Sequence, residues 1–279
     1  MYVHTYIHVR GVCGRDSRGL GPPPGRAACV PDFKLHQHQI LLRNLFFCKQ
    51  IYHMEARKVP QQVAETTGQL IHKIHLLTPE QMLEYYENWA DSYDKDLKSS
   101  DYEAPGICAE ALGKVLSDKS APIVDCAAGT GIVGEELRTV GFKNVDAVDY
   151  SQQSLDISAS KGVYRRLICN KFDENKIEEI KDDSYSGLIC VGALGMNHIT
   201  QSAFPEWNRI VQKGGFMVFT LSRVEYDDDV PDHRLVIGNG IQELLNKGTW
   251  ELIEKTAIPY HSGYLADMFT IRLKNKTDL

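Results

Sequence analysis

The sequence predicts an α/β fold in which a mostly parallel sheet is flanked by crossover helices. After Asp118, short apolar runs alternate with amphipathic stretches, which is typical of strands and helices in a parallel α/β sheet. Gly141, Gly162 and Gly214 follow predicted helices, where glycine commonly ends a helix in the left-handed conformation. The last two strand-like runs leave little room for a helix between them, so we expect them to pair antiparallel at one edge of the sheet.

The predicted elements begin at residue 78. Thr78 is expected to be the N-cap of a helix and Pro79 its first residue, because both residue types are typical of helix starts. A second helix is expected from Pro105 to Leu116, with apolar residues on one face. The strands and helices expected after it are PIVDCAA, GIVGEELRTVG, NVDAVDY, SQQSLDISASKG, RRLICN, SGLICVGAL, AFPEWNRIVQKGG, FMVFTLS, a helix near Gly240 to Asn246, TWELIEKTAI and DMFTIRLK.

Composition and charge narrow the range of functions. Of the 279 residues, 43% are hydrophobic, yet no run approaches the roughly 18 consecutive apolar residues of a membrane helix. The seven cysteines form no CxxC pair, which argues against a disulfide framework and against a metal site, and favours a cytoplasmic protein. Residues 1–53 carry seven Lys/Arg and two Asp, a net charge of +5, whereas residues 54–279 carry 24 Lys/Arg and 35 Asp/Glu, a net charge of -11. Because an acidic domain repels polyanions, we expect no nucleic-acid partner, and we expect no membrane partner.

The charge boundary coincides with an expected domain boundary. Residues 1–53 are predicted to be a disordered basic leader, since their Gly- and Pro-rich segment cannot bury a core. We expect the leader to be dispensable and consider an upstream start in the gene model as its origin; a mitochondrial targeting peptide is the alternative. Residues 54–279 are predicted to form the functional domain, with helices over 54–117 and the sheet over 118–279.

The segment from Pro122 to Ser151 carries the clearest functional pattern. A buried strand is expected to end at Asp125, followed by a turn of small residues and a helix from about Ile132. Such a turn lets a ligand approach the backbone closely, and the start of the helix offers unpaired N–H groups. The next strand ends at Asp149, whose carboxylate can accept both hydroxyls of a ribose. Together these features predict a site for a nucleoside-bearing cofactor at the carboxyl ends of the strands.

Two cofactors match this pattern. Gly129, Gly131 and Gly134 satisfy G-x-G-x-x-G with an acid about 20 residues further on, which indicates a dinucleotide site and an NAD-dependent oxidoreductase. Asp125 argues against a pyrophosphate beside it and favours a cofactor with an α-ammonium group, which a carboxylate can pair. S-adenosylmethionine carries adenine, ribose, a sulfonium and such an amino-acid end, and is therefore the preferred cofactor.

The same segment resembles a known family. The run Val124 to Gly131, VDCAAGTG, resembles motif I of the class I S-adenosylmethionine-dependent methyltransferases, usually D/E-x-G-x-G-x-G. Asp149-Tyr150-Ser151 resembles the second motif, and YYENWADSYDKDL, GVYRRLIC and ICVGALGMNHI are similar to the methyltransferase-like protein 27 group of that family. The resemblance covers about residues 83–221. It implies a Rossmann-like three-layer sandwich with a seven-stranded, mostly parallel sheet whose last strand is antiparallel.

The resemblance also implies roles for individual residues near the glycine turn. It places Asp125 near the methionine ammonium and Asp149 at the ribose hydroxyls, while a helix-loop cap is the alternative for Asp125. The residues it assigns to the loop under the cofactor are Ala127, Gly129 and Gly131. Ala127 departs from the motif, which has glycine there; the extra methyl group is expected to narrow the loop only mildly.

Further cofactor contacts are implied at the ends of other elements. The resemblance places Tyr150 beside the adenine and Gly192 and Ala193, just past the fourth strand, at the methionine side. Tyr93 is similar in position to a tyrosine that folds over the cofactor from the N-terminal helix. Asn170 stands where many members carry an acid that binds the adenine amine, and its amide can replace that contact.

Methyl transfer from a sulfonium is an in-line displacement, for which the protein mainly aligns the reactants and excludes water. His198, just after the fourth strand, is the candidate general base, with an ordinary structural role as the alternative. The expected acceptor is a small molecule or a protein side chain. An acidic cluster between the fifth and sixth strands either favours a cationic substrate or is a solvated loop. The alternatives to a methyltransferase are an NAD-dependent oxidoreductase and an inactive scaffold that only binds S-adenosylmethionine.

Overall fold

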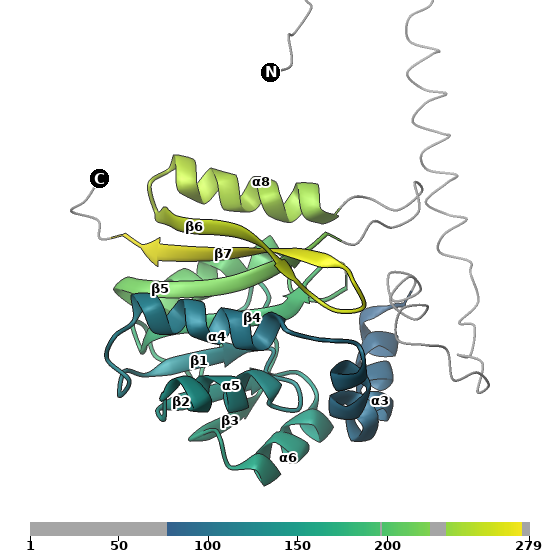
Figure 1. Cartoon of the computed structure of the whole chain (residues 1–279). Helices are drawn as coiled ribbons and strands as arrows, with labels where there is room; N and C mark the ends of the chain where they lie inside the picture. Colours follow the sequence, from purple (N-terminus) through teal and green to yellow (C-terminus); the bar gives the residue numbers. More distant parts are fainter. Residues whose placement is uncertain (1–76, 196, 224–232, 275–279) are drawn as a thin grey trace, which may run out of the picture. The chain divides into compact units, whose positions relative to one another are not determined.

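The computed structural model describes residues 77–195, 197–223 and 233–274 of the chain. The predicted leader and the acidic cluster at residues 227–232 lie outside the described residues. The described part is built on one seven-stranded sheet with the order β3-β2-β1-β4-β5-β7-β6 (Figure 1). No helix within the described ranges is long and apolar enough to cross a membrane.

The sheet confirms the predicted mostly parallel topology. β1 pairs in parallel with β2 and β4, β2 with β3, and β4 with β5, while β7 runs antiparallel to both β5 and β6. All strands except β7 therefore end at the same edge, called here the carboxyl edge, and start at the opposite amino edge. The strands are β1 (Ile123–Cys126), β2 (Val145–Asp149), β3 (Arg166–Cys169), β4 (Tyr185–Leu194), β5 (Val211–Ser222), β6 (Trp250–Pro259) and β7 (Leu265–Leu273).

Helices cover both faces of the sheet and give the predicted three layers. Apolar residues of α4 and α5 share one buried cluster with one face of the sheet, and those of α7 and α8 share another with the opposite face. α3 packs against α6 and lies at the carboxyl edge (Figure 1). The helices are α3 (Pro79–Ser99), α4 (Ala104–Val115), α5 (Ile132–Val140), α6 (Gln152–Lys161), the 3-10 turn η1 (Gln201–Ala203), α7 (Phe204–Ile210) and α8 (His233–Asn246).

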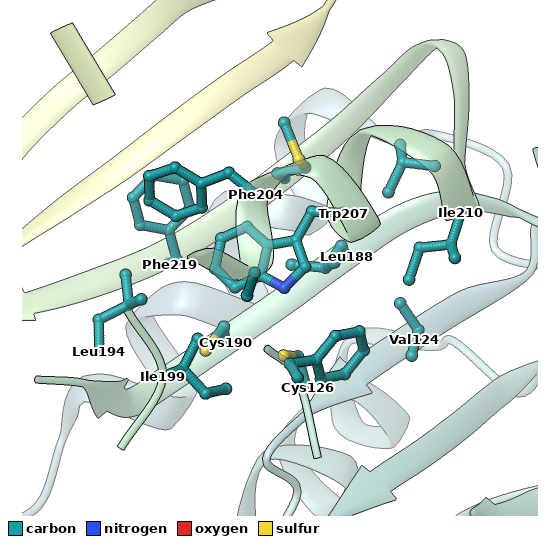
Figure 2. Close-up of a cluster of buried hydrophobic side chains, with 14 of the residues drawn as sticks. Val124, Cys126, Leu188, Cys190, Leu194, Ile199, Phe204, Trp207, Ile210 and Phe219 are labelled. Atoms are coloured by element: carbon teal, nitrogen blue, oxygen red, sulfur yellow. The ribbon is translucent and has the colours of Figure 1, made fainter. Parts of the chain in front are cut away.

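The core on the α7 side is aromatic. Figure 2 shows Trp207 of α7 beside Phe219 of β5, and the two ring centroids lie 5.5 Å apart. Trp207 is fully buried, as are Leu188 and Cys190 of β4 below it. Replacing such a buried tryptophan by alanine costs about 3–5 kcal/mol. This packing fixes β4 and β5, whose carboxyl ends carry part of the site.

The predicted start of α3 is confirmed. Thr78 Oγ1 accepts the Gln81 N–H, and Gln81 Oε1 accepts the Thr78 N–H, which completes a capping box with Pro79 at the first position. The predicted helix near Gly240 is longer than expected, because α8 already begins at His233. Ile237 and Ile241 lie one turn apart and are both buried, which explains why this segment packs as a helix.

Two of the three predicted glycine caps are confirmed. Gly141 and Gly162 end α5 and α6 with φ of 105° and 61°. The prediction for Gly214 is wrong, because α7 ends at Ile210 and Gly214 lies inside β5 with φ of 85°. It falls where the pairing of β4 with β5 shifts register, so its left-handed conformation serves an irregularity of the strand.

The predicted antiparallel strand pair closes at the carboxyl edge. The Tyr260 N–H donates to the Tyr264 carbonyl at 2.9 Å in the turn between β6 and β7. The Ser262 N–H donates to the Ser100 carbonyl at 2.6 Å, which attaches this turn to the end of α3. Residues 260–264, called here the β6–β7 turn, therefore lie at the same edge as the ends of β1, β2 and β4.

Candidate functional site

The turn between β1 and α5 is built from left-handed residues. Ala127, Gly129 and Gly131 have φ of 58°, 54° and 94°, and Gly131 is the N-cap of α5. A Cβ added to Gly129 would meet no described atom within 4 Å. The loop is therefore open on the side where a ligand would approach its backbone.

The sequence predicted that the methyl group of Ala127 narrows the loop mildly. The structure shows in addition that the backbone of Ala127 is strained. Its φ of 58° is a conformation that costs an L-residue with a Cβ roughly 1–2 kcal/mol. Glycine adopts it without this cost, which explains why the family motif has glycine at this position. The loop keeps its shape in spite of the substitution, and the cost falls on stability.

Asp149 holds the glycine loop from the end of β2. Its Oδ2 accepts the Gly129 N–H at 2.8 Å and its Oδ1 accepts the Ser151 N–H at 2.8 Å. Burial raises the pKa of the Asp149 carboxyl group. Each carboxylate oxygen can accept a second hydrogen bond, so the group can bind ribose hydroxyls while it still positions the loop.

Asp125 is a buried carboxyl group with one oxygen unused. Its side chain is fully buried, and the Tyr164 hydroxyl donates to Oδ2 at 2.6 Å. Its Oδ1 has no hydrogen-bond partner among the described residues. Burial raises the pKa of Asp125 to about 7, and the nearby Asp149 contributes in the same direction. A buried acid left in this state is costly unless a ligand supplies the missing partner.

Tyr164 explains the third glycine of the G-x-G-x-x-G match. Its hydroxyl accepts the Gly134 N–H at 3.1 Å, and a Cβ on Gly134 would lie 2.4 Å from the Tyr164 ring carbon Cζ. The first turn of α5 is thus occupied by the tyrosine that bonds Asp125. A pyrophosphate at the start of α5 would collide with the Tyr164 ring and would lie next to the Asp125 carboxyl group. This arrangement argues against a dinucleotide.

α3 is tied to the glycine loop through Asp94. Thr130 Oγ1 donates to Asp94 Oδ1 at 2.5 Å, and Lys161 Nζ of α6 contacts Asp94 Oδ2 at 2.6 Å. Lys161 also contacts Glu135 of α5 at 2.8 Å. Tyr93, whose predicted role is to fold over the cofactor, precedes Asp94 in α3. Burial raises its pKa, with Tyr260 and Asp149 as the next causes.

His198 and Asn197 follow β4 and contact the start of the chain's described part. The Tyr86 hydroxyl and His198 Nε2 lie 2.9 Å apart, with the two rings edge to face. Asn197 has φ of 59°, and its side-chain amide donates to the Leu77 carbonyl at 2.6 Å. Both residues are partly exposed, and the contact with Tyr86 places His198 between α3 and the end of β4.

Gly192 and Ala193 lie inside β4 and not past it, which corrects the predicted boundary. Gly192 is the one exposed position of this strand, and its N–H donates to Thr220 Oγ1 at 2.9 Å. Ala193 is buried and belongs to the core under α7. The pairing of β4 with β5 shifts register between Cys190 and Leu194, and Gly192, with φ of 79°, is the residue exposed within this irregularity.

Tyr150 and Asn170 follow β2 and β3. Tyr150 is half-exposed, and the Asn170 N–H donates to the Asp149 carbonyl at 3.0 Å. The Asn170 side-chain oxygen accepts the Lys171 N–H at 2.9 Å. The two residues therefore lie on either side of Asp149, at the ends of β2 and β3. In the described residues no group of three His, Cys, Asp or Glu side chains could hold a metal ion.

Several residues of the site were not predicted from the sequence. Tyr164 and Asp94 lie far along the chain from their partners, and no local pattern marks them. The aromatic turn YHSGY between two antiparallel strands was a usable signal, since it had to fall at the carboxyl edge. The residues missed are Asp94, Tyr102, Thr130, Tyr164, Tyr260 and His261.

The comparisons with known proteins agree with this geometry. A family model described as a methyltransferase domain matches residues 124–219. Human methyltransferase-like protein 27 is 32% identical over 142 residues, which cover 50% of this chain and 57% of that protein. An uncharacterized methyltransferase of Bacillus licheniformis is 22% identical over 189 residues, covering 67% of this chain and 84% of its own. The chain thus spans little more than half the length of the human relative.

Solved structures share the fold at low identity. The [4+2]-cyclase SpnF has a TM-score of 0.53 and 12% identity, covering 71% of this chain and 97% of its own. A Burkholderia thailandensis 1,6-didemethyltoxoflavin-N1-methyltransferase with bound 1,6-didemethyltoxoflavin and S-adenosylhomocysteine has a TM-score of 0.51 and 12% identity, covering 80% of this chain and 98% of its own. By its domain match, its relatives and its sheet order, the chain is similar to methyltransferases, and residues 124–219 carry the match to the methyltransferase domain.

Proposed function

We propose that this domain binds S-adenosylmethionine at the carboxyl edge and transfers its methyl group, by in-line displacement, to a small-molecule or protein nucleophile. The observation that carries the proposal is Asp125. It is a buried carboxyl group whose Oδ1 lacks a partner within the described residues, and it stands below a glycine loop whose outer side is open. These two features suit an α-ammonium group and a cofactor that approaches bare backbone.

The cofactor contacts are proposed as follows. Asp125 pairs with the methionine ammonium, and Asp149 accepts the ribose hydroxyls while it keeps the Gly129 N–H. Tyr150 flanks the adenine, and Asn170 bonds it. Gly192 faces the methionine side; Ala193, buried behind it, acts through packing. The loop residues beneath the cofactor are Ala127, Gly129 and Gly131.

S-adenosylmethionine supplies a methyl group made electrophilic by a sulfonium. The chain's own residues align the acceptor and exclude water, which is the larger part of catalysis for such a displacement. Tyr93 covers the site from α3, held there by the bonds of Asp94 to Thr130 and Lys161. His198 takes a proton from an acceptor that carries one, and the bond with Tyr86 orients its ring.

The fold alone does not select the reaction. One neighbour by fold is an N-methyltransferase holding S-adenosylhomocysteine, whereas another is a [4+2]-cyclase. Methyl transfer is therefore proposed from Asp125, and an inactive scaffold that only binds the cofactor remains the second candidate. Ala127 and Asn170, which depart from the family motif, favour that candidate.

The location and partners are also proposals. We place the protein in the cytoplasm, because the four cysteines of the described part, Cys108, Cys126, Cys169 and Cys190, are free thiols. We expect no nucleic-acid acceptor, because residues 54–279 carry a net charge of -11.

Calorimetry on the full chain tests the proposal. S-adenosylhomocysteine is expected to bind with micromolar affinity and to raise the melting temperature, while NAD does neither. Incubation with methyl-labelled S-adenosylmethionine and a cell extract then separates an enzyme from a scaffold, since only an enzyme labels an acceptor. Absence of S-adenosylhomocysteine binding at millimolar concentration would overturn the proposed site.

A further inference from the structure

The opening in β4 at Gly192 is bordered by phenol hydroxyl groups. Gly192 is exposed in an otherwise buried strand. A Cβ on Gly192 would lie 2.6 Å from the Tyr102 hydroxyl oxygen and 2.9 Å from the Tyr260 hydroxyl oxygen. The Tyr102 and Tyr260 rings pack edge to face, 5.5 Å apart. A side chain at position 192 would collide with both hydroxyl groups, so they lie against the bare backbone of Gly192, beside its exposed surface.

Aromatic residues of α3 adjoin this opening. Burial raises the pKa of Tyr93 and of Tyr102, and Tyr260 is the next cause for both. Tyr86 and Tyr93 also act on Tyr102. The ring centroids of Tyr86 and Tyr93 lie 6.4 Å apart, and we call Tyr86, Tyr93, Tyr102 and Tyr260 the tyrosine cluster. Trp89 packs edge to face against Tyr93 at 4.6 Å.

His261 in the β6–β7 turn leaves a buried polar atom unpaired beside this cluster. Its side chain is 6% exposed, and its ring lies 4.5 Å from that of Tyr260 and 6.2 Å from that of Tyr102. Its Nδ1 has no hydrogen-bond partner in the described part of the chain. Burial lowers the pKa of His261 and so favours the neutral ring, in which one nitrogen can accept a hydrogen bond.

The charge around the tyrosine cluster suits a cation. Two carboxyl groups, those of Asp149 and Asp94, act on Tyr93, and Lys161 pairs with Asp94. Aromatic faces and phenol oxygens also attract positive charge, whereas an anionic acceptor requires arginine or lysine partners. The lining thus favours a ligand that carries or acquires a positive charge.

Resting on the methyl transfer proposed above, we propose that the acceptor is an amine whose nitrogen lies at Gly192 within the tyrosine cluster. The nitrogen lone pair forms the new N–C bond as the C–S bond breaks and its electron pair stays on sulfur. The positive charge thereby moves from sulfur to nitrogen, where the aromatic faces stabilise it. A primary or secondary amine then releases one proton, which His198 takes. An alcohol acceptor gains no such benefit.

Calorimetry with a cation and a neutral molecule of similar size tests this inference. In the full chain saturated with S-adenosylhomocysteine, tetramethylammonium is expected to bind at least tenfold more tightly than tert-butanol. Tyr260→Leu and Tyr102→Leu remove an aromatic ring and should abolish this preference. Tyr260→Phe keeps the ring and most of the preference, and Tyr264→Phe, in the same turn, is the matched control.

The outcomes separate this inference from the proposed function. Equal affinity for the cation and the neutral molecule, with S-adenosylhomocysteine still bound, would overturn the amine acceptor and leave the cofactor site standing. Failure of S-adenosylhomocysteine to bind would overturn both. If the leucine variants unfold, upfield shifts of the tetramethylammonium methyl resonance in the wild-type protein report the aromatic faces directly, and an unshifted resonance contradicts the proposal. Labelled methyl groups should enter amines and not alcohols.

Discussion

The buried carboxyl groups at the two edges of the sheet are treated in opposite ways. Three carboxyl side chains of the described residues are buried, namely Asp125, Asp146 and Glu206. Asp146 and Glu206 lie toward the amino edge and pair with arginines, whereas Asp125 lies at the carboxyl edge with a tyrosine as its one hydrogen-bond partner there. Asp125 and Asp146 are both fully buried and stand on neighbouring strands, where Asp125 lies one residue nearer the carboxyl edge and points to the opposite face of the sheet.

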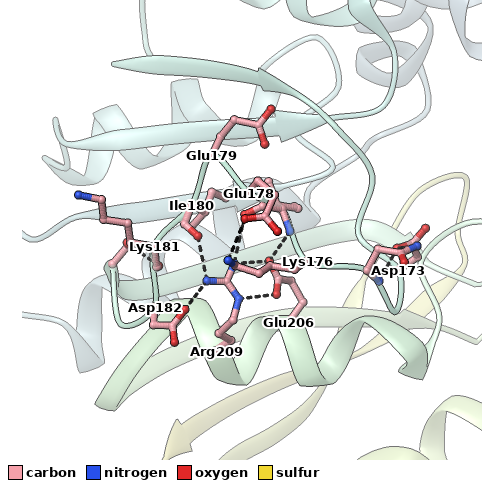
Figure 3. A network of polar contacts seen from close by, with 12 residues as sticks. Asp173, Lys176, Glu178, Glu179, Ile180, Lys181, Asp182, Glu206 and Arg209 are labelled. Atoms are coloured by element: carbon pink, nitrogen blue, oxygen red, sulfur yellow. Dashed lines mark hydrogen bonds and ion pairs between the residues drawn. The ribbon is translucent and has the colours of Figure 1, made fainter.

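At the amino edge the arginine contacts satisfy the carboxylates. Arg165 donates to both oxygens of Asp146 at 2.8 and 2.6 Å, and the Tyr185 hydroxyl adds a bond at 2.9 Å. Figure 3 shows Arg209 bonded to Glu206 and Asp182 and to backbone carbonyls of the β3–β4 connection. These networks hold the starts of β2, β4 and β5 together.

At the carboxyl edge the protein tolerates unfavourable features. They include the unpaired Oδ1 of Asp125, the unpaired Nδ1 of His261 and the left-handed conformations of Ala127 and Asn197. Each costs stability in the described structure. The difference teaches that one edge is built for stability and the other for binding, since departures from local rules gather at functional sites.

The largest effect on stability is expected at the amino edge. Glu206→Ala leaves Arg209, which is 17% exposed, without its main partner and should lower the free energy of unfolding by about 3 kcal/mol. Asp182→Ala removes a contact of the same arginine from a residue that is 71% exposed and should change stability little. Urea denaturation measures both. If Asp182→Ala lowered the free energy of unfolding more than Glu206→Ala does, Asp182 and not Glu206 would be the main partner of Arg209.

The next effect is expected on binding at the carboxyl edge. Asp149→Ala should weaken S-adenosylhomocysteine affinity by about 1–3 kcal/mol, the usual cost of an unpaired buried polar group. Asp156→Ala removes an exposed carboxylate from α6 and should leave the affinity unchanged. Calorimetry compares the two variants. Equal affinities would mean that the ribose lies elsewhere.

Asp125→Asn is expected to raise the melting temperature while it weakens cofactor binding. The pKa of Asp125 is raised from 3.8 to about 7, so between these pH values the folded state binds a proton that the unfolded state has released. The stability that this group contributes is thus complete below about pH 4 and lost as the pH rises through about 7. Asparagine removes the charge and keeps an acceptor for Tyr164. Thermal unfolding at pH 8 should show stabilisation, and a lower melting temperature would contradict it.

The smallest effect is expected at Ala127. Ala127→Gly relieves the left-handed conformation but adds flexibility to the unfolded chain, for a net stabilisation of about 0.5 kcal/mol. Ala128→Gly is the matched control, because its φ is not positive, and it should destabilise the protein. Chemical denaturation of the two variants measures the difference. Destabilisation by Ala127→Gly equal to that of the control would show that the loop is unstrained.

The sequence predicted the fold because the relevant signals are local. Alternating strands and helices, the cap at Thr78 and the glycines after α5 and α6 all act within a few residues. The predicted helix cap at Gly214 was wrong, because a glycine that follows a helix can also lie at an irregularity of the next strand. The start of α8 was missed because Ile237 and Ile241 gain their packing from distant strands.

The sequence predicted those parts of the site whose residues are close together in the chain. It did not predict contacts between residues that are far apart in the chain. The glycine loop and Asp149 form one β-α-β unit, so their spacing carried the prediction. The contact of Tyr164 with Asp125 and that of Tyr260 with Gly192 join residues far apart in sequence. Asp146 and Asp125 are both acidic residues in apolar strands. The sequence therefore could not predict that Asp146 forms an ion pair with Arg165 while Asp125 bonds a tyrosine.

The pH dependence of cofactor affinity tests most directly the claim that Asp125 is kept unpaired for a ligand. Calorimetry with S-adenosylhomocysteine between pH 5.5 and 7.5 compares the wild-type protein with Asp125→Asn. Because an ammonium group favours the ionised carboxylate, wild-type affinity should fall about tenfold per pH unit below about 7. The variant should bind weakly, with a nearly flat profile. Parallel profiles in the two proteins would contradict the claim.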